Sequence, residues 1–177
     1  MLYHFDGHEP TVGRDTYVAE SALVIGDVAI GDNCYIGHGV ILRGDYGRIT
    51  IGSGTAVEEG VVVHAPPQDL CAIGQLVTIG HGAIIHSKLI GDHVAIGMGA
   101  ILSIRAEVGA QAIVAEGAVV KREQKVAARV VVAGNPAKVV RQVSDKDVEH
   151  WTWANQLYID LAKKYLKLGM MYPVDMK

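Results

Sequence analysis

The chain has 177 residues with 16 basic and 19 acidic side chains, which gives a formal net charge of −3; half of its residues are apolar and 20% are charged. This balance is typical of one globular domain with a core large enough to fold without a metal ion or a disulfide. It argues against nucleic-acid and membrane partners, because there is no run of Lys or Arg and no stretch approaching 18 apolar residues.

Two features of the sequence bear on the compartment in which we expect the protein. Residues 1–6 have neither the basic region nor the apolar region of a secretory signal peptide. The two cysteines, Cys34 and Cys71, are too few for the disulfide framework of a secreted domain. We therefore expect a cytoplasmic protein with two free thiols.

Aliphatic residues recur at every sixth position in three registers. The registers are Val18, Val24, Ile30, Ile36 and Leu42, then Ile51, Val57 and Val63, then Ile84, Ile90, Ile96, Leu102, Val108, Val114 and Val120. This period fits neither the 3.6 residues of a helix nor the two residues of a strand. It predicts a parallel β-helix, in which each hexapeptide forms one short strand and a turn and three hexapeptides form a coil of about 18 residues. The abundant glycines suit the turns.

The registers break twice, between Leu42 and Ile51 and between Val63 and Ile84. The second break contains Pro66 and Pro67, which cannot donate to a strand ladder and so predict a protruding loop. Insertions into a solenoid form loops that often lie on its binding face. We expect the repeats to end near Val120.

The C-terminal part of the sequence predicts a change of structure. Residues 130–138 are typical of a last edge segment followed by a turn, and Ser144 with Asp147 has the spacing of a helix capping box. A helical apolar stripe follows, made of Ala154, Leu157, Tyr158, Leu161, Ala162 and Tyr165. Gly169 is a plausible end of this helix. We predict an all-β fold with a C-terminal helix: a single-stranded parallel β-helix over residues 1–143, and a segment over 144–177 that packs on its own or a neighbouring β-helix.

Eight histidines are the main candidates for chemistry. Four lie in polar turns, where solvated side chains are expected: His4, His8, His93 and His150. His64 and His86 are 22 positions apart, which is one 18-residue coil plus four residues that the Pro66–Pro67 loop can absorb. They should therefore be stacked neighbours on strands about 4.8 Å apart. Two imidazoles at that spacing can bind one zinc ion with Zn–N distances of about 2.0–2.1 Å.

His81 precedes His86 by five residues and should lie near the preceding corner, pointing away from the site that its own chain builds. If identical chains assemble around a three-fold axis parallel to the β-helix, His81 of one chain could meet His64 and His86 of the next. Three histidines and one open position are typical of a catalytic zinc site. The alternative is that all three are ordinary turn or surface histidines in a glycine-rich solenoid.

Four segments carry a resemblance to a known family: Arg43–Ile49, Val62–His64, Gly80–His86 and Ile96–Ala100. Together they resemble the γ-class carbonic anhydrase family, and more narrowly the hexapeptide proteins of bacterial carnitine and phenylacetate operons. The resemblance implies a left-handed β-helix, a homotrimer, and a zinc ion, or cobalt or iron, bound by His64, His81 and His86 at the subunit interfaces.

The resemblance also implies roles for three further residues. Arg43 and Asp45 match an inter-subunit ion pair near the metal, where they would organise the site; an ordinary surface pair, contributing about 0–1 kcal/mol, is the alternative. Tyr158 matches a helix tyrosine that approaches the metal pocket in relatives, although packing alone would equally explain it.

The sequence departs from the family pattern at the segment Ala56–Glu59, where relatives commonly carry Asn-Ile-Gln-Asp. Glu58 replaces a glutamine thought to orient the metal-bound hydroxide. A carboxylate there can accept a hydrogen bond or take a proton, but its charge should raise the pKa of the bound water. Tyr46 occupies the place of an acidic proton shuttle, and the later loop offers Asp69 instead. We therefore expect hydration and proton export to be slow.

The residues leave four functions open. We expect reversible hydration of carbon dioxide to bicarbonate by a zinc-bound hydroxide, with Glu58 and Tyr158 as catalytic residues. The second function is hydrolysis of an acyl-CoA thioester, with Arg48 or Lys88 binding phosphate. The third is metal-free acyl transfer with a histidine base, and the fourth is a metal-bearing trimeric scaffold without catalysis.

Overall fold

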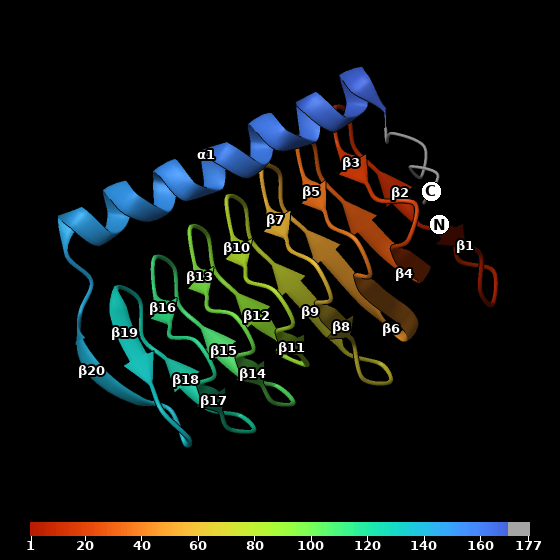
Figure 1. Ribbon diagram of the computed structural model, residues 1–177. Coiled ribbons are helices and arrows are strands. Elements are labelled where there is room, and N and C mark those ends of the chain that lie inside the picture. Colours follow the sequence, from red (N-terminus) through yellow and green to blue (C-terminus); the bar gives the residue numbers. More distant parts are fainter. Residues whose placement is uncertain (170–177) are drawn as a thin grey trace, which may run out of the picture.

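The computed structural model describes residues 1–169. They form a left-handed β-helix of about seven coils, and one long helix lies along its flank (Figure 1). The end of the predicted C-terminal segment, residues 170–177, lies outside the described residues. The hexapeptide period therefore predicts the architecture correctly.

Each coil contributes short strands to three faces, and strands on one face pair in parallel with the coils before and after. The first face contains β1 (Leu2–Tyr3), the starts of β4 (Leu23–Ile30) and β6 (Ile41–Ile51), β8 (Val62–His64), β11 (Ile84–Ile85), β14 (Ile101–Leu102) and β17 (Val119–Val120). The second contains β2 (Thr11–Val12), the ends of β4 and β6, β9 (Leu70–Ile73), β12 (Leu89–Ile90), β15 (Glu107–Val108) and β18 (Lys125–Val126). The third contains β3 (Tyr17–Val18), β5 (Tyr35–Ile36), β7 (Ala56–Val57), β10 (Thr78–Ile79), β13 (Ala95–Ile96), β16 (Ile113–Val114) and β19 (Val130–Ala133), with β20 (Lys138–Gln142) antiparallel to β19.

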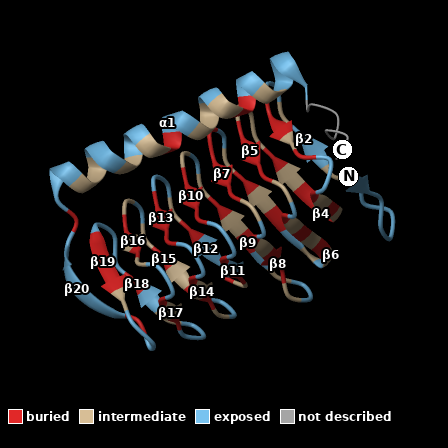
Figure 2. Ribbon diagram, viewed as in Figure 1, coloured by how far each residue is buried: buried red, intermediate tan, exposed pale blue. Residues whose placement is uncertain are grey.

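Buried residues recur from coil to coil (Figure 2), and their aliphatic side chains form a core arranged in columns, one behind each face. On the first face the paired and fully buried residues are Val24, Leu42, Val63, Ile85, Leu102 and Val120. On the other two faces, glycine often follows the buried aliphatic residue, as after Ile30, Ile90 and Ile96, because the next coil is close. A Cβ added at Gly97 would lie 2.4 Å from the backbone nitrogen of Glu116. The stacking therefore requires glycine at such positions as well as aliphatic residues inside.

The structure corrects two details of the predicted registers. Ile85 lies in the core while Ile84 is exposed, because the register resumes earlier than predicted, at Ile73 and Ile79. The coils also continue beyond Val120: Val126 pairs with Val108, and Val132 pairs with Val114. These two valines extend the spacing of six, so the parallel pairing between coils ends at β19, to which β20 adds as an antiparallel strand.

The predicted loop at Pro66 and Pro67 absorbs the extra length of its coil. Val63 pairs with Ile85, so the strands on either side of the insertion remain in register. Three hydrogen bonds fasten the loop: the Gln68 backbone N–H donates to the Tyr46 carbonyl, the Arg48 backbone N–H donates to the Asp69 carbonyl, and the Asp69 carboxylate accepts from Arg105 Nε at 2.7 Å.

Helix α1 (Asp145–Leu168) begins with the predicted capping box of Ser144 and Asp147 and is capped by Gly169. It packs against β3, β5 and β7, where the Tyr165 ring stacks on Tyr17 with ring centroids 4.6 Å apart. The predicted apolar stripe is wrong at Leu157, which is 49% exposed, because Asn155 occupies the buried line instead. Within residues 1–169, no helix has the length and apolar character needed to cross a membrane.

The columns make a testable prediction about stability. Replacing the fully buried Ile96 by alanine should lower the free energy of unfolding by about 2–5 kcal/mol, because it removes apolar contact and leaves a cavity. Leu89→Ala, at a strand position that is 42% exposed, should cost about 0.5 kcal/mol or less. Urea unfolding of both variants measures the difference, and equal losses would contradict the assignment of the core.

Candidate functional site

His64 and His86 lie side by side at one corner of the β-helix. His64 ends β8, and His86 directly follows β11, the strand that pairs with β8. Their ring centroids are 4.9 Å apart and the rings are steeply inclined to each other. The pairing of consecutive coils therefore brings these two imidazoles together, and the rings then meet edge to face.

The hydrogen-bonding groups at this corner are unusually poorly satisfied. Within residues 1–169, both ring nitrogens of His64 and Oδ1 of Asp45 are buried without a hydrogen-bond partner. His64 Nε2 and Asp45 Oδ1 are 3.5 Å apart. Buried polar atoms nearly always have a partner, since an unpaired one costs about 1–3 kcal/mol. A metal ion, which accepts a lone pair, would satisfy one of the two His64 nitrogens, while the other nitrogen of the neutral ring carries the N–H.

Electrostatics favours the neutral, ligand-competent form of both rings. The pKa of His64 is lowered chiefly by burial and then by the positive charge of Arg43, and the same two causes lower the pKa of His86. A neutral imidazole keeps one nitrogen lone pair for a metal. The corner is thus suited to bind a cation through nitrogen.

Arg43 and Asp45 form an ion pair beside these histidines, from β6. Arg43 Nη1 lies 2.7 Å from Asp45 Oδ2. Burial alone would raise the pKa of Asp45, but the hydrogen bond and charge of Arg43 bring it below its usual value. The resemblance implied a pair between subunits; in the described chain the pair forms within one subunit. It fixes Asp45 in the direction of His64.

A second cluster surrounds His81, in the turn between β10 and β11. His81 Nε2 lies 3.0 Å from Glu58 Oε2, and His81 Nδ1 lies 2.8 Å from Glu59 Oε2. Glu58 also accepts the His81 backbone N–H at 3.1 Å, and Glu59 accepts the Tyr35 hydroxyl at 2.6 Å. Both sides of the imidazole are therefore held by carboxylates, while the ring remains about half exposed.

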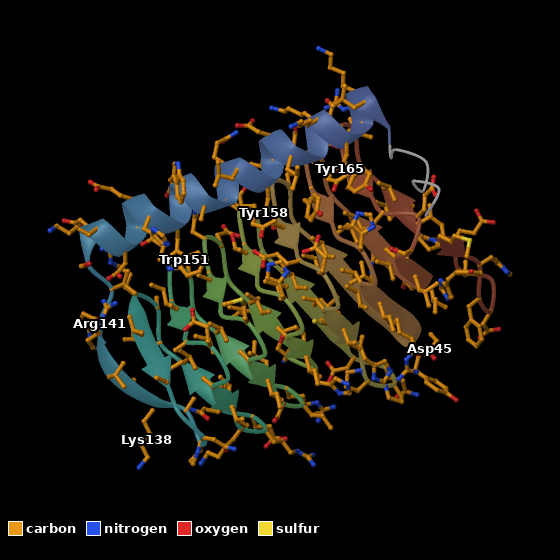
Figure 3. All side chains as sticks on the ribbon, in the orientation of Figure 1. Asp45, Lys138, Arg141, Trp151, Tyr158 and Tyr165 are labelled. Carbon is orange, nitrogen blue, oxygen red and sulfur yellow. The ribbon has the colours of Figure 1, made fainter. Side chains whose placement is uncertain are left out.

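Glu58 and Tyr158 meet beneath the helix, at the inner side of this second cluster. Glu58 is 6% exposed, and burial raises its pKa despite the opposing charge of His81. Burial and the neighbouring Glu58 carboxylate raise the pKa of Tyr158. Figure 3 shows Tyr158 on the side of α1 that faces the coils, and Asp45 far from it at another edge of the coils.

One chain therefore carries two separate clusters of the predicted site residues. The first comprises Arg43, Asp45, His64 and His86, and the second comprises Glu58, His81 and Tyr158. Within the described part of the chain, no three His, Cys, Asp or Glu side chains are arranged to hold a metal ion. His81 does not join His64 and His86 inside a single subunit.

Sequence reasoning missed Glu59 and Tyr35. A signal for Glu59 was present, because residues at one corner follow each other from coil to coil. The Gly60 N–H bonds to the His38 carbonyl and the Gly82 N–H bonds to the Glu59 carbonyl, so His38, Glu59 and His81 form one column. Aligning the hexapeptides so that residues at the same corner coincide would have predicted that Glu59 lies one coil before His81.

The lowered pKa values predict how the stability of the metal-free protein depends on pH. Because the folded state disfavours protonation of His64 and His86, their contribution is fully present above about pH 6.5 and is lost as the pH falls below it. Urea unfolding with a chelator, at stepped pH, should show this loss. The double variant His64→Phe and His86→Phe should have a flatter profile, whereas His150→Gln should not; an unchanged profile in the double variant would contradict the assignment.

Comparison with known proteins places this geometry in a family. The bacterial transferase hexapeptide (six repeats) family matches residues 9–44. The chain is 38% identical to carnitine operon protein CaiE of Salmonella agona, over 90% of this chain and 81% of that protein. It is also 38% identical to mitochondrial gamma carbonic anhydrase 2 of Arabidopsis thaliana, over 87% of this chain but only 58% of that longer protein. A hexapeptide transferase family protein from Anaplasma phagocytophilum superimposes with a TM-score of 0.88 at 34% identity, over 93% of this chain and 98% of that one. The chain belongs to the hexapeptide-repeat family of left-handed β-helix proteins that includes CaiE and the gamma carbonic anhydrases.

Proposed function

We propose that this protein is a γ-carbonic-anhydrase-like enzyme that reversibly hydrates carbon dioxide at a metal ion shared between copies of the chain. One observation carries the proposal: His64 and His86 are stacked, and both buried nitrogens of His64 have no partner in the described chain. The 38% identity to a relative named gamma carbonic anhydrase supports it.

The residues that would hold the metal are His64 and His86 of one chain and His81 of the next. Zinc is our first choice, with cobalt or iron as alternatives, because imidazole nitrogen suits all three ions. Bound zinc supplies a hydroxide nucleophile at neutral pH, since it lowers the pKa of its water to roughly 7. Burial keeps the imidazoles neutral, and Arg43 holds Asp45 beside His64.

The need for a second copy follows from the two clusters on one chain. His81 is half exposed and lies in a different turn from His64 and His86, so its ring faces outward from its own subunit's edge. A homotrimer around an axis parallel to the β-helix would set the His81 cluster of one chain against the His64 cluster of the next. Each interface would then contain one complete three-histidine set.

In that arrangement Glu58 would enter the site together with His81. Its carboxylate accepts from the His81 backbone and is buried, and its raised pKa makes it a stronger base than an ordinary glutamate. It is therefore suited to take a proton from a reacting water. Its charge would also oppose the build-up of negative charge on that water, so we expect modest catalysis. Tyr158 packs next to Glu58 and restrains it.

Removing the His81 side chain should abolish metal binding without dissociating the trimer. His81→Ala eliminates one ligand of each shared set, so metal content measured by plasma mass spectrometry should fall from about one per chain to nearly none. Light scattering should still report a trimer. The matched control is His38→Ala, because His38 occupies the same corner column two coils earlier. Full metal content in His81→Ala would refute the assignment.

Replacing Glu58 by glutamine separates two roles for this carboxylate. If its charge hinders formation of the nucleophile, Glu58→Gln should raise the rate of carbon dioxide hydration, followed by stopped flow with a pH indicator. The Glu59→Gln variant serves as a neighbouring control. A clear loss of rate in Glu58→Gln would instead make Glu58 the essential base.

The acyl-transfer alternative is favoured by the likeness to the structure named hexapeptide transferase family protein. In that function a histidine acts as the base without a metal. Protein stripped with EDTA should then keep acetyl-CoA-dependent activity. Under our proposal the stripped protein loses carbon dioxide hydration and regains it with zinc. Thioester hydrolysis and a non-catalytic scaffold would appear as metal-loaded protein without hydration activity.

We further propose that the enzyme works in the cytoplasm. Cys34 and Cys71 are both free and buried, and burial raises the pKa of Cys71 to about 12. Such thiols are inert packing residues, as expected of a protein in a reducing compartment.

A further inference from the structure

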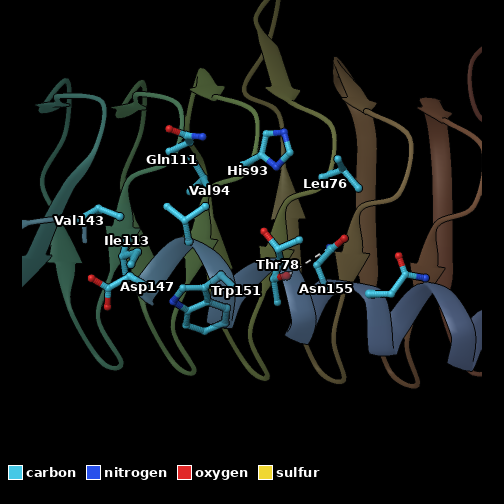
Figure 4. Close-up of a pocket in the computed structure, with 13 residues that line it drawn as sticks. Leu76, Thr78, His93, Val94, Gln111, Ile113, Val143, Asp147, Trp151 and Asn155 are labelled. Carbon is cyan, nitrogen blue, oxygen red and sulfur yellow. Dashed lines mark hydrogen bonds between the residues drawn. The ribbon is translucent and has the colours of Figure 1, made fainter. Parts of the chain in front are cut away.

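A cavity of about 170 Å³ lies between the first half of α1 and the third face of the β-helix (Figure 4). Its floor is formed by Thr78 of β10, Val94 directly before β13, and Ile113 of β16. Helix α1 covers it with Trp151 and Asn155. None of the residues in the two histidine clusters lines it, so it is a separate site from the one described above.

The wall of the cavity is mainly apolar and includes one large aromatic surface. Leu76, Val94, Ile113 and Val143 contribute aliphatic groups, and the half-buried Trp151 indole contributes a ring face. Apolar walls with a few well-placed polar groups are typical of small-molecule sites. An engineered apolar cavity of about 150 Å³ accepts benzene, so the space here fits one six-membered ring with a small substituent.

One buried polar group, the Asn155 side chain, would orient a ligand in the cavity. Asn155 is 4% exposed, and its amide nitrogen lies 3.3 Å from both the Val77 carbonyl and Thr78 Oγ1. Within residues 1–169, all hydrogen bonds of this side chain run through the nitrogen. The carbonyl oxygen of Asn155 is therefore free to accept a hydrogen bond from a ligand.

The charges around the cavity favour a neutral ligand. Asp147 is the one carboxylate in the described lining, and it is already bound by Arg141 and Ser144. No lysine or arginine belongs to that lining. His93 also lines the cavity and is the one group in the described lining that protonation could make positive, so an anionic ligand would find no permanent counter-charge here. A cation would have to displace the Arg141 ion pair.

From this combination we propose that the cavity binds a small neutral aromatic molecule with a single hydrogen-bond donor, of the phenol class. Its ring packs on Trp151, Val94 and Ile113, and its hydroxyl donates to Asn155 Oδ1. The site is independent of the metal, so its occupancy does not depend on the proposed carbonic anhydrase activity.

Tryptophan fluorescence tests the proposal directly. The chain has two tryptophans, and Trp153→Phe removes the exposed one and leaves Trp151 as the reporter. Titration with phenol should quench or shift this emission in a saturable way. Anisole has the same ring without the donor and should bind at least about tenfold more weakly. Phenyl phosphate, which is charged, should not bind.

A cavity-filling variant tests whether phenol binds in this cavity. Ile113→Phe in the Trp153→Phe background should weaken phenol binding by about tenfold or more, because the new ring occupies the space. The control is Leu89→Phe, an exposed strand position on another face. Circular dichroism verifies that both variants are folded. No saturable change with phenol, or equal binding by Ile113→Phe and its control, would overturn the proposal.

Discussion

The parallel register between consecutive coils is the constraint on which the candidate site depends. Val63 pairs with Ile85, and this single pairing sets the next residues, His64 and His86, side by side. The register is held by buried aliphatic columns, because a slip of one residue would turn every inward side chain outward. The four-residue insertion at the Pro66–Pro67 loop leaves the site intact because it lies outside the strands. Core packing and functional geometry therefore have the same origin.

This constraint also explains why one chain cannot by itself bring the three proposed ligands together. The fold can stack histidines only in columns, and His81 belongs to a different column from His64 and His86. Its two ring nitrogens are held by Glu58 and Glu59, whereas those of His64 have no hydrogen-bond partner within residues 1–169. One corner thus presents an imidazole between two carboxylates, and the other presents a buried imidazole whose nitrogens lack a partner. In the proposed shared site, His81 of a second copy would exchange one of its carboxylate contacts for the metal ion held by His64 and His86.

Much of this could be predicted from the sequence, because the fold repeats a simple rule. The spacing of six predicts the β-helix, and the 22 positions between His64 and His86 predict their stacking. The register failed at Ile84, because two adjacent isoleucines satisfy the pattern equally and only packing shows that Ile85 faces inward. The helix stripe failed at Leu157 for a similar reason: Asn155 replaces an apolar contact by hydrogen bonds to β10 and the residue before it, which no periodicity reveals. To predict the contacts of Glu58 and Glu59 with His81, residues at the same corner of successive coils must be aligned. The strand pattern alone does not provide this alignment.

The most direct test of the shared site is complementation between two variants that are each defective. His64→Ala chains keep His81, and His81→Ala chains keep His64 and His86. Unfolding the two together and refolding them with zinc should restore metal binding at interfaces where one chain of each kind meets, although neither variant alone retains metal. Metal content of the mixed trimer, measured after gel filtration, gives the result. Recovery in the mixture is predicted; a mixture that binds no more metal than its parents would contradict a site shared between chains.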